Sequence, residues 1–354
     1  MPMLDPHSVL GYLFDDINLK IDADMVRKYW RDAAARGCPW ALHESDYDRV
    51  PLKIFGDDCV YDEKLDKAYA LVLSLPLWRP NSARNSRFIL WSQKSSNFVG
   101  FEGMLPVLAR MVWSFNLAYD ERLPKSGLRF ALTEIGGDWA WNRFFWQFSR
   151  HWNGAKPCPF CEVEKFGPRG YGQLNDICWG TNLDFVNMVG SGGTGRPNPF
   201  ILLKNFHVSV VQPCQLHNLH LGLLWTSNGG GLATFCECGY FGDPTIRLAL
   251  LVEAAWGDFK LYMKQGGQRC SQTKFTVKMI FKKSHGAYFS AKGHNSRVIS
   301  DWLADCAERA WTGNLGGSRI FGLWLIGQPN LLQRVRTHEQ FAPLCHALPL
   351  STIS

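Results

Sequence analysis

Three strand-length apolar runs in close succession constrain the fold of this chain more than any other feature. The segment "VPLKIFGDD" alternates apolar residues from Val50 to Ile54 and then stops at a Gly-Asp-Asp turn, which is the pattern of a strand that ends in a loop. The runs "AYALVLSLPLW" at 68–78 and "SRFILWS" at 86–92 are apolar enough to be central strands. We therefore expect three consecutive paired strands.

The pattern that follows these strands predicts the rest of the sheet. Apolar residues recur at helical spacing from Met104 to Phe115, and "SGLRFALTEIGGD" then returns to strand alternation up to Asp138. Further helices are expected at 139–152, from Pro244 onward and at 295–311, and a short strand at 206–213. Three strands, a helix and a fourth strand follow one another as in a ribonuclease-H-like fold. The expected class is α/β, with a mixed sheet flanked by helices.

Glycine-rich breaks and composition shifts suggest how the chain is divided. The clearest breaks are "GSGGTGRPN" at 190–198 and "GNLGGS" at 313–318. We interpret 1–48 as an N-terminal lead-in or remnant, and 49–312 as a ribonuclease-H-like core. Within the core, a cysteine-rich insertion is expected at about 151–205, and 313–354 would form a C-terminal tail.

Composition excludes several classes of protein. The 15 Trp and 23 Phe residues need a core to bury them, which excludes general disorder. No stretch approaches the roughly 20 apolar residues of a membrane span, so no membrane partner is expected. The 11 cysteines are an odd number without a recognisable secretory signal, which favours thiols or metal ligands over a disulfide framework.

The net charge of +7 is concentrated in one stretch. Residues 264–297 contain eight Lys and Arg residues, no acid, and interleaved aromatic residues. This combination suits a nucleic-acid backbone with stacked bases, and a solvated strand face beside a loop is the simpler alternative. The candidate nucleic-acid-binding residues are Lys274, Lys278, Lys282, Lys283, Lys292 and Arg297.

Two aspartates stand at equivalent positions in the predicted sheet. Asp57 follows the first strand and Asp138 follows the fourth. Carboxylates at neighbouring strand ends would suit Mg²⁺ or Mn²⁺, and two such ions can cleave a phosphodiester. The glycine before each aspartate would leave room for a nucleic-acid backbone. Turns after strands are, however, rich in Asp and Gly for purely conformational reasons.

A third acid would complete such a site. Glu253 is the first candidate because it interrupts an almost continuous apolar run, where a carboxylate is costly to bury without a partner or a metal. Asp258, Asp301 and Glu308 are the other candidates.

Cysteines and histidines suggest a second metal site. Cys158 and Cys161 have the C-x2-C spacing of half a zinc site, and Cys214 and His217 could supply two more ligands. A redox-active or incidental cysteine pair is the alternative, and a buried cysteine is often only a small apolar residue. His220 completes the run "QPCQLHNLHLG" and could equally be a packing residue. Other ligand candidates are His151, Cys178, Cys236 and Cys238.

These elements together resemble the eukaryotic cut-and-paste transposases with a DDE/D catalytic core on a ribonuclease-H-like fold. The resemblance is carried by Asp57 in "PLKIFGDD", Asp138 in "EIGGDWAW" and the C-x2-H element "CQLH" that begins at Cys214. The run "LHNLHLGL", the pattern "GDW…RHW…C-x2-C" and "KGHNSR" look like transposon-derived families expanded in protists such as dinoflagellates. The resemblance covers roughly residues 48–310. No DNA-binding module of the kind usual in these transposases is recognisable at the N-terminus.

The resemblance implies a nuclear, DNA-binding protein. If active, it would cut and join phosphodiesters with Mg²⁺ or Mn²⁺ held by Asp57, Asp138 and Glu253. Cys214 and His217 would hold the insertion to the sheet and share a structural Zn²⁺ with the C-x2-C pair.

Two other functions are compatible with the same residues. One is a catalytically inactive, zinc-stabilised nucleic-acid-binding protein derived from a mobile element. The other is a metal hydrolase centred on Cys214, His217 and His220. Each of the three hypotheses is compatible with a homo-oligomer.

Overall fold

The computed structural model describes residues 3–60, 66–150, 154–158, 164, 196–214, 216–266, 269–282 and 286–312. The chain divides into two compact units, Met1–Cys214 and Gln215–Ser354. Each unit has its own hydrophobic core. The division falls within the 49–312 segment that the sequence suggested as one core.

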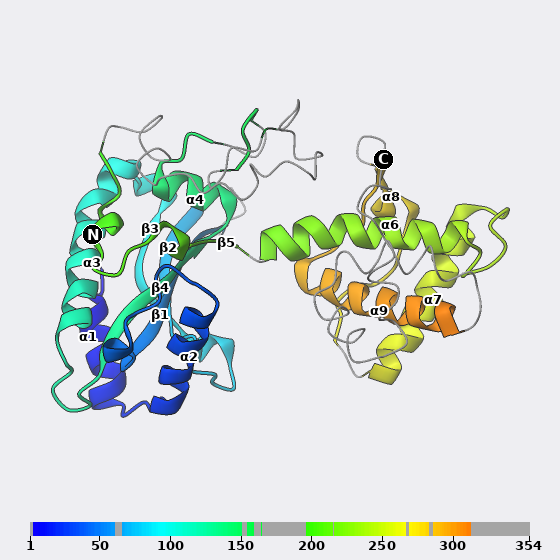
Figure 1. Ribbon diagram of the computed structural model, residues 1–354. Coiled ribbons are helices and arrows are strands. Elements are labelled where there is room, and N and C mark those ends of the chain that lie inside the picture. The colour runs from blue at the N-terminus through cyan, green and yellow to red at the C-terminus, as the bar shows by residue number, and fades with distance from the viewer. Residues whose placement is uncertain are drawn as a thin grey trace. The chain divides into compact units, whose positions relative to one another are not determined.

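The first unit is built on a five-stranded sheet in the order β3-β2-β1-β4-β5 (Figure 1). The strands are β1 (Arg49–Val60), β2 (Lys67–Ser74), β3 (Arg87–Lys94), β4 (Arg129–Gly137) and β5 (Val211–Pro213). Strands β1, β2 and β3 pair antiparallel, whereas β4 pairs parallel to β1 and β5 pairs parallel to β4. The predicted α/β class with a mixed sheet is confirmed, and the topology is compatible with a ribonuclease-H-like fold. Most of the predicted cysteine-rich insertion lies outside the described residues.

Helices flank this sheet on both sides. They are α1 (Pro6–Gly11), α2 (Ala23–Ala35), α3 (Phe101–Asp120) and α4 (Trp139–Trp146), with a π-helical turn at Tyr12–Asp16 after α1. Helix α3 packs against β4 and α1, whereas α2 packs against β1 (Figure 1). Met104, Leu108 and Met111 of α3 are fully buried, as the predicted helical spacing requires.

The N-terminal residues belong to the core of the first unit. Leu10, Phe14 and Trp30 are at most 2% exposed and join the same apolar cluster as the sheet. The indole Nε1 of Trp30 also donates a hydrogen bond of 2.7 Å to the carbonyl of Arg49, at the start of β1. The segment interpreted as a lead-in therefore contributes to the packing of the sheet.

The second unit is mainly helical. Its elements are a π-helical segment η8 (Leu216–Leu223), α6 (Leu224–Glu237), α7 (Leu248–Gly266), α8 (Val277–Ile280), β6 (Phe281–Lys282), β7 (Gly286–Ala287) and α9 (Gly293–Thr312). Fully buried aromatic residues such as Phe235, Phe259 and Trp302 fill its core. None of the helices in the described ranges is long and apolar enough to cross a membrane.

One predicted helix boundary is wrong. We expected a helix beginning at Pro244, but α7 begins at Leu248. Asp243 Oδ1 accepts hydrogen bonds from the backbone and hydroxyl of Thr245, at 2.9 and 2.7 Å. These contacts close a local turn that precedes the helix.

Candidate functional site

The pairing of β1 with β4 brings the two predicted aspartates side by side. Gly56 of β1 is the partner of Gly137, the last residue of β4, in this parallel pair. Asp138 therefore follows the end of β4 as predicted, but the predicted end of the first strand at Gly-Asp-Asp is wrong. Strand β1 continues to Val60, so Asp57 lies within it and pairs with Ala70 of β2. Neighbouring strands lie about 4.8 Å apart, so the two carboxylates start from adjacent positions at the same edge of the sheet. This edge is where open α/β sheets usually bind their ligands.

A β-bulge sets this register. Leu52 pairs with Leu132, but the next residue, Lys53, pairs with Glu134, so that Thr133 is left over. The Thr133 hydroxyl donates to the carbonyl of Leu52 at 3.1 Å and accepts from the Tyr29 hydroxyl at 3.0 Å. Since a shift of one residue would change which side chains lie opposite each other, the bulge is required to align the two aspartates.

The glycines before the aspartates have a different role from the one we predicted. A Cβ atom at Gly56 would lie 2.0 Å from ring atoms of Trp141, and one at Gly137 would lie 2.3 Å from the same indole. The space that we assigned to a nucleic-acid backbone is therefore filled by this tryptophan, which is only 5% exposed. By the alternation of side chains along a strand, Asp57 lies on the opposite face from Gly56.

Each aspartate also has a local structural contact. Asp138 is the N-cap of α4, and its Oδ1 accepts a hydrogen bond of 2.6 Å from the backbone of Trp141. Asp57 Oδ1 accepts one of 2.8 Å from the backbone of Asp58. These contacts restrict where the carboxylates can point, which favours a defined ligand geometry over two mobile side chains.

A lysine that the sequence interpretation missed stands at the same edge. Lys67 Nζ lies 2.8 Å from Asp58 Oδ2, and the pair is half-exposed. The hydrogen bond and charge of Asp58 raise the pKa of Lys67, with a smaller contribution from the charge of Asp138. The edge therefore contains, beside the two aspartates, a lysine whose charge is paired with Asp58.

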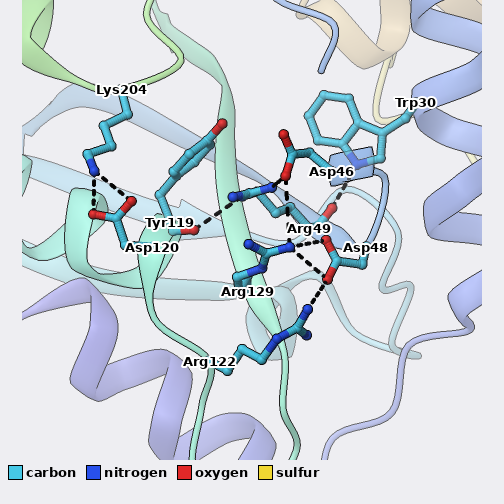
Figure 2. A network of polar contacts seen from close by, with 9 residues as sticks. All are labelled: Trp30, Asp46, Asp48, Arg49, Tyr119, Asp120, Arg122, Arg129 and Lys204. Atoms are coloured by element: carbon cyan, nitrogen blue, oxygen red, sulfur yellow. Dashed lines mark hydrogen bonds and ion pairs between the residues drawn. The ribbon is translucent and has the colours of Figure 1, made fainter. Parts of the chain in front are cut away.

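The opposite ends of β1 and β4 carry a network of a different kind (Figure 2). The buried Arg49 donates to Asp46 and to the carbonyl of Tyr119, and its guanidinium lies 4.1 Å from the Tyr119 ring centre. Arg129 Nη2 donates to both carboxylate oxygens of Asp48, at 2.8 and 3.0 Å.

The charges of this network are already paired with one another. Burial opposes ionisation of Asp48, but hydrogen bonds from Arg129 and Arg122 outweigh it and hold the pKa of this carboxyl below its usual range. We assign the network to fold stability, because Asp46 and Asp48 are each ion-paired with arginines of the first unit.

We chose Glu253 as the third acid because we expected its carboxylate to be buried, and this expectation is wrong. Glu253 lies on α7 in the second unit and is exposed, so the cost of burying an unpaired carboxylate does not arise. Its participation in a metal site stays a prediction. Asp301 and Glu308 are exposed as well.

Asp258 is the half-buried acid of α7. Its Oδ1 accepts from Trp302 Nε1 at 2.7 Å and from Arg309 Nη2 at 2.8 Å, while its Oδ2 accepts from Arg309 Nη1 at 2.9 Å. These bonds tie α7 to α9, so this carboxylate serves the packing of the second unit.

The predicted zinc ligands are only partly described. Cys158 and Cys214 are half-buried, His217 is exposed, and Cys161 lies outside the described residues. His220 is half-buried beside Gly293. Burial lowers its pKa, and the charge of Arg297 adds to this effect. The zinc site and its ligand set stay a prediction.

The basic residues that can be placed are all exposed. They are Lys274, Lys278, Lys292 and Arg297, whereas the side chain of Lys282 and the whole of Lys283 lie outside the described part of the chain. Lys292 lines an open groove of about 570 Å³ together with Trp225 and the polar residues Ser271, Gln272 and Asn295. An exposed cation beside an aromatic residue is a combination that nucleic-acid-binding grooves use.

Taken together, the first unit is an α/β domain with two aspartates at adjacent backbone positions of a mixed sheet that is compatible with a ribonuclease-H-like fold. Among the described residues, no group of three or more His, Cys, Asp or Glu side chains is close enough to hold a metal ion alone. Scans of protein-family models and of curated proteins found no match. The function must therefore be inferred from the residues and their geometry.

Proposed function

We propose that this protein is a transposase-like DNA-processing protein whose active site is the pair Asp57 and Asp138. The observation that supports this proposal is the adjacency of their backbone positions, Asp57 within β1 and Asp138 directly after β4, in the register that the Thr133 bulge sets. Mg²⁺ in phosphoryl-transfer enzymes is usually bound by one or two carboxylates, with water and substrate phosphate completing its coordination. Two carboxylates are thus a sufficient protein contribution.

The two aspartates would hold Mg²⁺ or Mn²⁺, and the ion would supply positive charge that stabilises the transition state of phosphodiester cleavage. Water, or a 3′-hydroxyl in the joining step, would lose its proton and form the new P–O bond. The bond to the leaving oxygen would break at the same time, and that oxygen would take up a proton. Binding of the metal ion by the two aspartates does not require a third acid such as Glu253.

DNA would be bound by the exposed basic residues of the second unit. Lys274, Lys278, Lys292 and Arg297 project into solvent, and Lys292 borders the groove that contains Trp225. Phosphate contacts of this kind bind DNA without sequence specificity and weaken steeply with salt. A protein that acts on chromosomal DNA would be located in the nucleus.

Nicking of supercoiled plasmid DNA tests the proposal. We expect cleavage by the wild type with Mg²⁺ or Mn²⁺, and a loss of at least about 100-fold for Asp57→Asn and Asp138→Asn. Asparagine retains the N-cap contact of Asp138, so this change separates the catalytic charge from helix capping. Asp22→Asn is the matched control, because Asp22 caps α2 in the same way and accepts from Asp24 at 2.7 Å.

A wild type that binds DNA but shows no metal-dependent cleavage would favour the second candidate function. That candidate is a catalytically inactive nucleic-acid-binding protein, and the exposed basic residues beside the groove support it. Structural Zn²⁺ would then be expected in the purified protein, bound by Cys158, Cys161, Cys214 and His217. Metal analysis of the wild type and of His217→Ala would test that ligand set.

A further inference from the structure

Helix α7 has an apolar outer face that the described residues of the second unit leave exposed. Its inner face is buried through Leu251, Val252, Ala255 and Phe259. On the opposite face, Leu250 is 51% exposed and Leu261 is 58% exposed. Two large aliphatic side chains on one helix, each more than half exposed, leave apolar surface that burial against a partner would stabilise.

The residues between these leucines are small. Ala254 is exposed, and a Cβ atom added at Gly257 would meet no atom within 4 Å. Leu250, Ala254, Gly257 and Leu261 follow one another at spacings of four, three and four residues, which is the seam of a helix that packs against another helix. Small residues at its centre allow two helix backbones to approach closely.

The two charged residues beside this seam, Glu253 and Lys260, have opposite signs and can pair between two copies of the helix. Glu253 and Lys260 are both exposed, lie seven residues apart and therefore stand on the same side of the seam. Neither forms an ion pair with another residue of the described chain. When two copies of such a helix pack antiparallel about a two-fold axis, the same side of each helix meets its counterpart, so Glu253 of one copy faces Lys260 of the other.

We propose that α7 is a self-association surface on which a second copy of this chain packs antiparallel. Leu250 of one copy contacts Leu261 of the other at both ends, Ala254 contacts Gly257 at the centre, and two Glu253–Lys260 pairs lie along one side of the seam. One helix pair buries less than the roughly 1,200–2,000 Å² of a standard interface, so this contact alone gives a weak, concentration-dependent dimer. The inference is independent of the proposed DNA-cleaving site.

Sedimentation velocity of the full chain over a range of concentrations tests the inference with a charge swap. The wild type is expected to show a sedimentation coefficient that rises with concentration. Glu253→Lys and Lys260→Glu should each lose this rise, because each places like charges across the seam. The double variant Glu253→Lys/Lys260→Glu should recover it, since the pairs are restored with reversed sign.

Glu237→Lys is the matched control, because Glu237 is exposed at the end of α6 and the same change of charge there should leave association unchanged. Leu261→Glu should abolish association without touching the charge pairs. A wild type that stays monomeric at every concentration, for instance because other residues of the chain cover this face, would overturn the inference. Dimerisation that survives both single charge changes would overturn it equally.

Discussion

Trp141 links the candidate site to the rest of the fold. Its indole lies over Gly56 and Gly137, and its backbone nitrogen donates to the carboxylate of Asp138. One residue thus fixes the strand ends from one side and one candidate metal ligand from the other. From the sequence we predicted that the space beside these glycines is left for DNA. The sequence alone does not show that Trp141, four positions after Gly137, folds back over this glycine.

This packing makes a direct prediction for Gly56. Gly56→Ala would place a methyl group 2.0 Å from the Trp141 ring, which is too buried to move away freely. We expect the free energy of unfolding to fall by about 1–3 kcal/mol, as in other overpacked cores. Urea titration of the variant and the wild type measures this difference.

Gly230→Ala is the control for the same substitution. Gly230 lies within α6, and an added Cβ atom would contact nothing within 4 Å. Alanine is favoured over glycine inside a helix by about 0.8–1.0 kcal/mol, so this variant should be as stable as the wild type or slightly more so. Equal losses for both variants would mean that Trp141 does not pack against Gly56.

At the scale of elements, one carboxylate adds polar contacts to the apolar packing between α7 and α9. Burial opposes ionisation of Asp258, but hydrogen bonds from Arg309 and Trp302 outweigh it, so its pKa is held below the usual value near 3.8. Because the folded pKa is lower than the unfolded one, this carboxylate stabilises the fold at higher pH. Its contribution is complete above about pH 5 and is lost as the pH falls below about 4.

Asp258→Asn should therefore lower the free energy of unfolding by about 1–3 kcal/mol at neutral pH, since charged hydrogen bonds between α7 and α9 are lost. The gap between this variant and the wild type should narrow when urea titrations are repeated at about pH 3. Asp305→Asn is the control, because Asp305 bonds the same arginine at 2.9 Å but is 42% exposed and belongs to a surface pair. Asp305→Asn should lower the free energy of unfolding by less than about 1 kcal/mol. A gap that does not change with pH would contradict the assignment.

At the scale of the whole molecule, the sequence predicted the sheet well because its signal is local. The three apolar runs, the helical spacing from Met104 and the strand before Asp138 are periodic patterns, and all appear in the structure at nearly the expected places. The adjacency of Asp57 and Asp138 also followed from that strand order. What could not be predicted was the bulge at Thr133, because it depends on contacts with Tyr29 more than 100 residues away.

The second unit was harder to predict for a related reason. Glu253 and Asp258 lie in the same apolar segment, and the sequence alone does not show which turns inward. The structure turns Asp258 toward Arg309 and leaves Glu253 exposed, and Arg309 is 51 residues further along the chain. The separate core of this unit likewise depends on contacts between α6, α7 and α9 that no single segment indicates.

Titration of Mn²⁺ into the purified protein, with free ion measured by electron paramagnetic resonance, tests the central claim most directly. If Asp57 and Asp138 together hold a divalent cation, the wild type binds Mn²⁺, and Asp57→Asn or Asp138→Asn each weakens binding by about tenfold or more. The N-cap control Asp22→Asn binds as the wild type does. A wild type that does not bind Mn²⁺, or aspartate variants that bind it as tightly as the wild type, would contradict the account.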